Sequence, residues 1–382
     1  MIFTLEVLDA RFGDALLLHY GSSGGRKLIV IDGGPSGVYK ATLRPRLKEL
    51  QSELDPAASL PIRLLMVSHI DGDHITGVIS LADEMVKQKQ AKKPAPYRVD
   101  TLWHNSFDDI IGNEADVLYR ALSPIAGRAI KLAGSLQPSR ISPMGARIIM
   151  TVRQGRDLRG YAKKLRLKVN KPFPKWVIAS DDKKNQIQID DDLKFTVIGP
   201  DRDNLINLRK EWDKELKKMK RKKDLRALMD FLDVAAENLS SIVVLAECGG
   251  KTMLLTGDAR GDFIISGLRQ AGLLKYGKFH TNLLKIPHHG SDRNVSTDFF
   301  RQITADHYVI SADGTYGNPD IPTLQMLSNA RGKSKFNIYL TNKEKRLVTF
   351  FRSEKQKGKK YKVFFREEDA YSISVPLGDS NG

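Results

Sequence analysis

The chain has 382 residues, 41% of them hydrophobic, and a formal net charge of +17. A composition of this kind excludes a disordered chain and is sufficient for one large domain or two ordinary ones. The basic balance favours polyanionic partners, such as nucleic acid, an anionic membrane surface or phosphorylated small molecules, although a solvated basic surface has the same charge.

Cysteine usage and the N-terminus limit the possible classes further. A single cysteine, Cys248, excludes an internal disulfide framework and a cysteine-based zinc cage. The first residues have neither the basic start nor the apolar core of a signal peptide. No apolar run reaches the ~20 residues that a membrane span needs. We therefore expect a cytoplasmic protein without a membrane span.

The first half of the chain alternates between short apolar runs and helical patterns. Gly and Asp punctuation predicts strands at 3–10, 14–20, 27–34 and 63–70. Apolar spacing then predicts a helix over 75–90, directly after the fourth strand and its polar motif. A further strand is expected at 99–106, with helices at 115–136 and 161–169.

The second half repeats this alternation. Helices are expected at 203–233, where the pattern is highly charged, at 262–274 and at 296–303. Segments 240–250 and 251–259 are expected to pair as a hairpin across Gly249 and Gly250. The remaining expected strands are 193–200, 282–290, 307–313, 336–342, 346–352, 359–367 and 371–377.

These elements predict one α/β domain over residues 1–330, with a basic helical insertion around 85–235. Residues 331–382 are expected to form a β-rich, basic C-terminal extension that includes the lysine-rich loop KQKGKK. No internal repeat and no clear linker divides the chain, so these boundaries are soft.

The stretch MVSHIDGDHITG, residues 66–77, has an unusual density of metal-binding side chains. His69, Asp71, Asp73 and His74 follow an apolar strand at its end. Imidazole nitrogens mixed with carboxylate oxygens suit zinc, manganese or iron. A polar turn with an N-capping aspartate would explain an isolated D-x-D, but two flanking histidines make that reading much weaker.

Two distant strands end in the same way. Asp258 follows the apolar run TMLLTG, and His288 and His289 follow NLLKIP. Three apolar strands, each followed by metal-type side chains, predict that these loops meet at one site. His288 is slightly preferred over His289 as a ligand because it comes first after the strand.

These motifs together resemble the metallo-β-lactamase superfamily, and within it the soluble hydrolase domain of ComEC-type competence proteins. The likeness rests on VIDGG with Asp32, the H-x-D-x-D-H motif at 69–74, TGDA at 256–259 and PHHGS at 287–291. GDALLL at 13–18 and YGNPD at 316–320 support it. It spans roughly residues 5–325 except 85–190, and implies a four-layer αββα sandwich with one or two divalent ions, Zn or Mn.

The resemblance also implies roles for single residues. His69 and Asp71 would serve the first metal, and Asp32 would orient ligands. Asp73, His74 and Asp258 would be the catalytic residues and would bind the second metal, completed by His288 or His289. Candidates for further roles, each with an equally ordinary structural explanation, are His104 as a replacement ligand and Lys285 and Ser291 as substrate contacts.

The sequence departs from the family pattern in three places. Aspartate replaces histidine at position 71, as is usual in the ComEC-like branch. No histidine stands near Pro200 and Asp201, where a further ligand of the first metal is normally found. Asn318 stands where that branch usually has histidine. The first metal would therefore be weakly held or absent.

The resulting functional expectation is hydrolysis by a metal-bound hydroxide, most simply of a phosphodiester in DNA or RNA. The basic helix around 208–226 and the aromatic-basic tail at 343–366 fit nucleic acid, but equally fit a solvated helix and a half-buried sheet. Two alternatives remain open: a hydrolase of small esters, lactones or phosphoesters, and a non-catalytic nucleic-acid-binding module.

Overall fold

The computed structural model of the chain describes residues 1–378 except 23, 55–57, 107–142, 180–185, 204, 208, 211–213, 215–216 and 218–240. The helix expected at 115–136 and most of the one expected at 203–233 lie outside the described residues. Within the described part, no helix is both long and apolar enough to cross a membrane.

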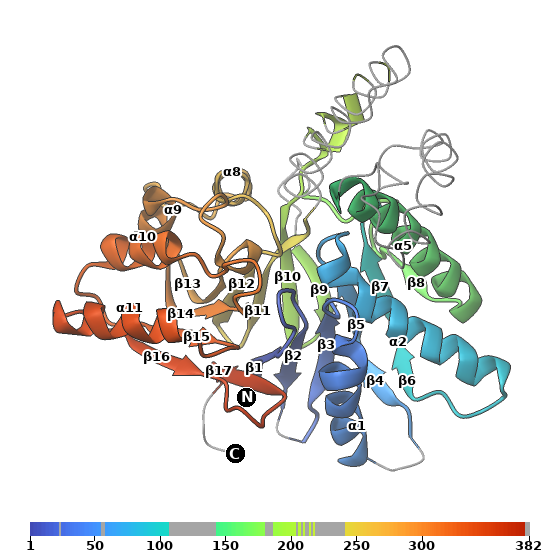
Figure 1. Cartoon of the computed structure of the whole chain (residues 1–382). Coiled ribbons are helices and arrows are strands. Elements are labelled where there is room, and N and C mark those ends of the chain that lie inside the picture. Colours follow the sequence, from blue (N-terminus) through green and yellow to red (C-terminus); the bar gives the residue numbers. More distant parts are fainter. Residues whose placement is uncertain are drawn as a thin grey trace, which may run out of the picture.

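Two mixed β-sheets form the centre of the molecule (Figure 1). The first has the strand order β17-β1-β2-β3-β5-β7-β8 and the second the order β16-β15-β14-β13-β12-β11-β10-β9. The strands of the first sheet are β1 (Ile2–Leu8), β2 (Leu16–Gly21), β3 (Lys27–Ile31), β5 (Leu64–Val67), β7 (Thr101–His104), β8 (Lys168–Val169) and β17 (Ser372–Pro376).

The second sheet collects most of the later strands. They are β9 (Gln186–Asp190), β10 (Leu193–Gly199), β11 (Val243–Cys248), β12 (Lys251–Leu255), β13 (Phe279–Lys285), β14 (Ile303–Ile310), β15 (Asn337–Leu340) and β16 (Lys362–Phe365). A separate two-stranded sheet pairs β4 (Leu60–Ile62) with β6 (Tyr97–Val99). The molecule is thus mixed α/β, as expected.

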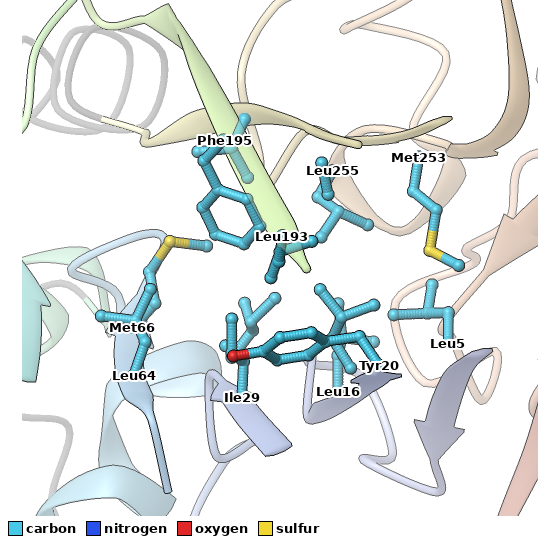
Figure 2. Close-up of a cluster of buried hydrophobic side chains, with 14 of the residues drawn as sticks. Leu5, Leu16, Tyr20, Ile29, Leu64, Met66, Leu193, Phe195, Met253 and Leu255 are labelled. Atoms are coloured by element: carbon cyan, nitrogen blue, oxygen red, sulfur yellow. The ribbon is translucent and has the colours of Figure 1, made fainter. Parts of the chain in front are cut away.

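A hydrophobic core lies between the two large sheets. Leu5 and Leu16 of the first sheet and Phe195 and Met253 of the second all belong to it, and all are fully or almost fully buried (Figure 2). Alternate residues of β1 and β10 point into this core because side chains of a strand alternate between its faces. The buried Cys248 thiol belongs to the same core.

Helices cover the outer faces of both sheets, so the layers run helix, sheet, sheet, helix (Figure 1). In α2, Ile75, Val78 and Leu81 follow helical spacing and pack on the first sheet. On that side lie the π-helical turn η1 (Tyr39–Leu43), α1 (Arg44–Ser52), α2 (Gly72–Gln90) and α5 (Pro143–Leu165). The other side has α8 (Gly261–Gln270), α9 (Thr297–Gln302), α10 (Ile321–Arg331) and α11 (Lys345–Gln356).

The hairpin expected across Gly249 and Gly250 is confirmed. Strands β11 and β12 pair antiparallel, and both glycines have positive φ, 56° and 73°. Two-residue hairpin turns of this kind require left-handed backbone, which glycine adopts without a steric penalty.

The structure differs from several sequence-based expectations. Segment 346–352, expected as a strand, lies in α11, where Leu347 and Phe351 are buried one helical turn apart. The helical insertion expected around 85–235 stays a prediction, and its described part contains the strands expected at 99–106 and 193–200 as well as β8 and β9. The helix expected from residue 75 begins at Gly72, so that Asp73 and His74 lie in its first turn.

The C-terminal residues expected to form an extension contribute to both sheets. β15 and β16 continue the second sheet in parallel, while β17 pairs antiparallel with β1. The expected domain boundary at residue 330 stays a prediction, but this segment shares its sheets with the rest of the chain.

Candidate metal centre

The polar motifs found in the sequence meet where parallel strands of the two sheets end. β3 and β5 are parallel neighbours in the first sheet, and β12 and β13 are parallel neighbours in the second. The residues that follow these four strands, Asp32, the 69–74 motif, Asp258 and the 288–289 pair, are therefore delivered to one place. Carboxyl ends of parallel strands are the usual position for a site in such sheets.

Four side chains form the centre of this cluster: Asp73, His74, Asp258 and His289. One potential ligand atom from each lies within 4.8 Å of all the others. His74 Nε2 is 3.1 Å from Asp258 Oδ2. His289 Nε2 is 3.5 Å from Asp73 Oδ2 and 3.6 Å from Asp258 Oδ2. The two sequence-distant halves of the chain thus supply two ligands each.

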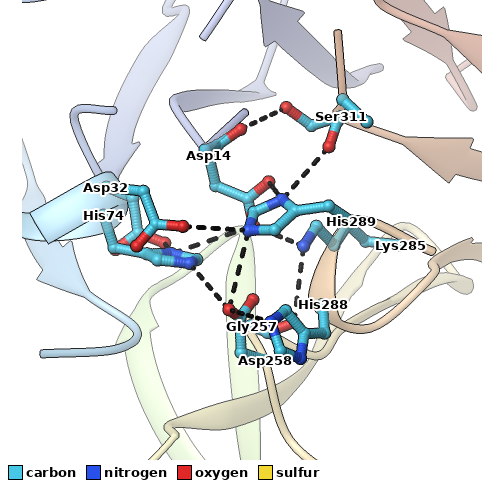
Figure 3. Close-up of polar contacts among 12 residues, drawn as sticks. Asp14, Asp32, His74, Gly257, Asp258, Lys285, His288, His289 and Ser311 are labelled. Carbon is cyan, nitrogen blue, oxygen red and sulfur yellow. Dashed lines mark hydrogen bonds and ion pairs between the residues drawn. The ribbon is translucent and has the colours of Figure 1, made fainter. Parts of the chain in front are cut away.

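Hydrogen bonds on the far side of each ring turn Nε2 toward this centre. His74 Nδ1 lies 3.0 Å from Asp32 Oδ2, and the backbone N–H of Ser68 donates to the same carboxylate at 2.7 Å (Figure 3). His289 Nδ1 lies 3.1 Å from the Ser311 carbonyl oxygen. Carboxylates and carbonyls accept, so both Nδ1 atoms donate, and in the neutral rings both Nε2 atoms carry a lone pair. Asp32 thus contacts the ring of His74 on the side away from the centre, and the orienting role implied by the family resemblance stays a prediction.

Three buried atoms of this group have no hydrogen-bond partner among the described residues. They are His74 Nε2 and His289 Nε2, which face the centre, and Asp258 Oδ1. Buried polar atoms normally have partners, and leaving one without a partner costs about 1–3 kcal/mol. Two imidazole nitrogens and two carboxylates converging in this way fit a divalent ion such as zinc or manganese. The donor set suits a metal.

Electrostatics couple these four groups strongly. Burial disfavours the charged imidazolium, but the carboxylates of Asp258 and Asp32 raise the pKa of His74 well above its usual value. Burial raises the pKa of Asp258, but the facing His74 and His289 rings lower it well below the ordinary range. The carboxylates that raise the pKa of His74 would also attract a divalent cation, which would compete with protons for the ring nitrogens.

Asp14 is a member of the site that the sequence analysis did not identify. Its carboxylate is fully buried and forms an ion pair with the buried ammonium of Lys285. Asp14 Oδ1 also lies 3.4 Å from His289 Nδ1, and Asp14 Oδ2 lies 3.9 Å from His74 Nδ1. Its signal was the polar residue immediately before the apolar run ALLL, at a strand start rather than a strand end.

Lys285 is not a solvated charge, which was the ordinary alternative to a substrate contact at this position. Only 1% of the residue is exposed, and its Nζ lies 3.4 Å from the Gly257 carbonyl oxygen besides contacting Asp14. Burial lowers the pKa of the ammonium, but Asp14 raises it to above the usual value overall. The buried pair links the end of β13 to the loop before β2.

The residues expected at the first metal lie nearby but form no comparable group. His69 Nε2 is 3.7 Å from Asp71 Oδ2, and its Nδ1 is 3.2 Å from the Ser241 hydroxyl. His104 ends β7 and is buried with neither ring nitrogen hydrogen-bonded, and burial, then Arg159, lower its pKa to about 3. Among the described residues, two groups of three or more candidate ligands occur, the four side chains above and the set Asp14, Asp32 and His74. Neither group contains His69, Asp71 or His104.

The distances favour His289 over His288, contrary to the sequence-based preference. His288 Nδ1 lies 2.8 Å from Asn294 Oδ1, and its Nε2 is 3.7 Å from Asp258 Oδ2, at the edge of the cluster. Both histidines have left-handed backbone, with φ of 47° and 54°, which costs roughly 1 kcal/mol or more each. Ser291 ends this turn, where it is buried and its N–H donates to the His288 carbonyl.

Comparisons with known proteins give limited further information. No family model matches the chain. A 97-residue stretch, 25% of this chain, is 31% identical to ComE operon protein 3 of Bacillus subtilis (strain 168), and covers 12% of that protein. A crystal structure from Parabacteroides distasonis ATCC 8503, named "Putative metal-dependent hydrolase", aligns with 88% of this chain and 92% of its own at a TM-score of 0.35 and 10% identity. A score this low does not establish a common fold.

Proposed function

We propose that this protein is a metal-dependent phosphodiesterase that hydrolyses DNA or RNA, with the sandwich fold of the metallo-β-lactamase superfamily and a ComEC-like site. The observation that carries the proposal is the convergence of Asp73, His74, Asp258 and His289, with buried atoms that lack hydrogen bonds turned toward one another. The similarity to part of ComE operon protein 3 and the layering of helices around two sheets support it.

The chain's own residues prepare the centre for a cation. A divalent ion bound there would supply Lewis acidity and an activated water at neutral pH. Asp32 and the Ser311 carbonyl hold the two imidazoles with Nε2 facing inward. Because Asp73 and Asp258 both belong to the group, one of their oxygens remains available to hold a water by hydrogen bonding.

Charge supports a phosphate-bearing substrate. The net charge of +17 attracts polyanions, and neutralising their phosphates releases counterions, which favours binding. A phosphodiester also suits a site that offers metal ligands but no protein nucleophile, because a metal-activated water would act as the nucleophile.

Cleavage of labelled single- and double-stranded DNA and RNA with added Mn²⁺ or Zn²⁺ tests the proposal. The wild type is compared with Asp73→Ala/His74→Ala and with a matched control, His280→Ala/Asp298→Ala, which changes the same residue types at exposed positions. We expect the wild type and the control to cleave and the site variant to be inactive.

Other outcomes would contradict the proposal in distinct ways. Hydrolysis of small esters without cleavage of any nucleic acid would assign a small-molecule hydrolase. Binding of nucleic acid without cleavage by any of the three proteins would assign a non-catalytic binding module.

A further inference from the structure

A second concave site lies at the opposite end of the first sheet from the metal centre. It is a cavity of about 640 Å³, within the range of typical ligand pockets. Leu64 and Thr101, which begin β5 and β7, line it, whereas His69 lies beyond the other end of β5. The five steps from Leu64 to His69, at about 3.3 Å each, separate the two places by roughly 16 Å.

This cavity, called the basic groove below, is lined by residues from distant parts of the chain. Its charged members are four cations and one carboxylate: Arg63, Arg166, Lys168, Lys171 and Asp100. Its remaining lining residues are Leu64, Val99, Thr101, Trp103, Pro172, Ile187, Gln188 and Ile189.

The single carboxylate is already neutralised. Asp100 Oδ2 accepts a hydrogen bond of 2.8 Å from Arg63, so these two charges cancel. Arg166, Lys168 and Lys171 are exposed and have no ion pair with any described residue. Three uncompensated cations therefore surround one concavity, an arrangement that attracts an anion with several charges.

The walls of the basic groove suit an extended chain. β8 and β9 are the terminal strands of the two large sheets as far as the structure describes them, so each offers backbone N–H and C=O groups on its outer side. Ile187 and Ile189, both half-buried, add apolar surface between the cations. Cations combined with apolar surface fit a single strand of nucleic acid. Its phosphates can contact the cations, and its unpaired bases can pack against the apolar side chains.

We propose that the basic groove binds the phosphate backbone of single-stranded nucleic acid and holds the substrate at a second point, remote from the metal centre. This inference rests on the proposed function for the identity of the polymer. A dinucleotide, with about 3.4 Å between bases, is too short to occupy both places. The basic groove therefore contributes to the binding of long substrates and not of short ones.

Two triple variants test the basic groove. Arg166→Gln/Lys168→Gln/Lys171→Gln removes its free cations, and Arg269→Gln/Lys275→Gln/Lys278→Gln removes the same charges at exposed positions at the end of α8 and beyond it. Binding is measured by fluorescence anisotropy with a labelled single strand longer than the roughly 4–16 nucleotides of typical single-strand sites. A chelator is present, so that binding is read without cleavage.

We expect the groove variant to bind the single strand at least about tenfold more weakly than wild type at about 0.1 M salt, and the control variant less than about twofold. The slope of log K against log salt should fall by about 2 in the groove variant, since each lost phosphate contact on a single strand contributes about 0.7. Hydrolysis of bis(para-nitrophenyl) phosphate with metal should be equal in all three proteins.

The binding test of the basic groove gives a different outcome from a failure of the proposed function. A selective loss of single-strand binding in the groove variant supports the basic groove even if no protein cleaves nucleic acid. Equal binding by the two triple variants would overturn it even if the wild type is a nuclease. An equal loss on duplex and single strand would also overturn it, because charge alone would then explain the effect.

Discussion

Two buried charge clusters of this protein differ in the hydrogen bonding of the carboxylate at the centre of each. The first is the Glu6 cluster, made of Glu6, His19, Arg46 and Ser372. Glu6 is 2% exposed, and its carboxylate accepts from His19 Nε2 at 2.8 Å, from Arg46 Nε at 2.7 Å and from the Ser372 hydroxyl. It ties β1, β2, α1 and β17 together.

The metal centre is buried to a similar degree but is not satisfied internally. Within the described residues, His74 Nε2, His289 Nε2 and Asp258 Oδ1 are buried without hydrogen-bond partners. The comparison teaches that burial of charge alone does not identify a functional site. A central carboxylate with a full set of partners, like that of Glu6, supports the fold even though His19 Nδ1 has none among the described residues. Several converging atoms without hydrogen bonds instead indicate a ligand-binding site.

The largest expected effect comes from Asp258→Asn. This change removes one charged ligand from the centre of the group and should abolish stable metal binding. Hydrolysis should fall about 10⁴-fold, ~5.5 kcal/mol of transition-state free energy. Metal content after dialysis and the hydrolysis rate provide the measurement. Full metal retention in this variant, or metal loss in Glu6→Gln, would contradict the claim that only the Asp258 cluster binds a metal.

The next effect concerns Lys285, which neutralises Asp14 behind the metal centre. Lys285→Ala leaves a buried carboxylate unpaired and should lower the free energy of unfolding by about 3–5 kcal/mol. Asp14→Asn/Lys285→Met removes both charges and should recover most of this loss. Urea denaturation of the three proteins measures both quantities. If the double variant is no more stable than Lys285→Ala, the unpaired charge of Asp14 is not the cause of the lost stability.

The contribution of the Glu6 cluster to stability should depend on pH in the acid range. Burial raises the pKa of Glu6, but hydrogen bonds from His19, Arg46 and Ser372 lower it from 4.5 to about 2. The ionised form therefore stabilises the fold above pH 4.5, and this contribution is lost as the pH falls from about 4.5 to about 2.

The size of the acid effect follows from the shift. A difference of 4.5 to about 2 corresponds to about 3 kcal/mol at about 1.36 kcal/mol per unit. The stability difference between wild type and Glu6→Gln, followed by urea denaturation across this pH range, should shrink accordingly. A difference that does not change with pH would show that the charge of Glu6 is not what stabilises the cluster.

The smallest effect separates the two neighbouring histidines. His289→Ala should weaken metal binding strongly, because its Nε2 belongs to the four-ligand group. His288→Ala should weaken it about tenfold or less, about 1.4 kcal/mol, because His288 lies at the edge and bonds Asn294. Titration calorimetry with Mn²⁺ or Zn²⁺ compares them. The reverse order would restore the preference drawn from the sequence.

Much of the metal centre was predictable because strand ends are local signals. The apolar runs before His69, Asp258 and His288 placed these side chains at carboxyl ends of strands, and parallel pairing of β12 with β13 brought the later ones together. Asp14 was missed because a single aspartate before a strand resembles a turn residue. Its role depends on the buried Lys285, which lies 271 positions further along the chain.

Other features depend on tertiary context. The segment containing Leu347 and Phe351 is rich in β-branched and aromatic residues, which favours strand by propensity, but packing of one face against the second sheet makes it helical. The basic groove was invisible in the sequence. Its walls come from residues 63–64, 99–103, 166–172 and 187–189, which no local pattern connects.

The most direct test of the central claim is an anomalous difference map from crystals of the protein soaked with Mn²⁺ or Zn²⁺. We predict a peak bounded by Asp73, His74, Asp258 and His289, with both Nε2 atoms turned toward it. A well-ordered structure with no peak at this place under saturating metal would contradict the assignment of the cluster as a metal centre.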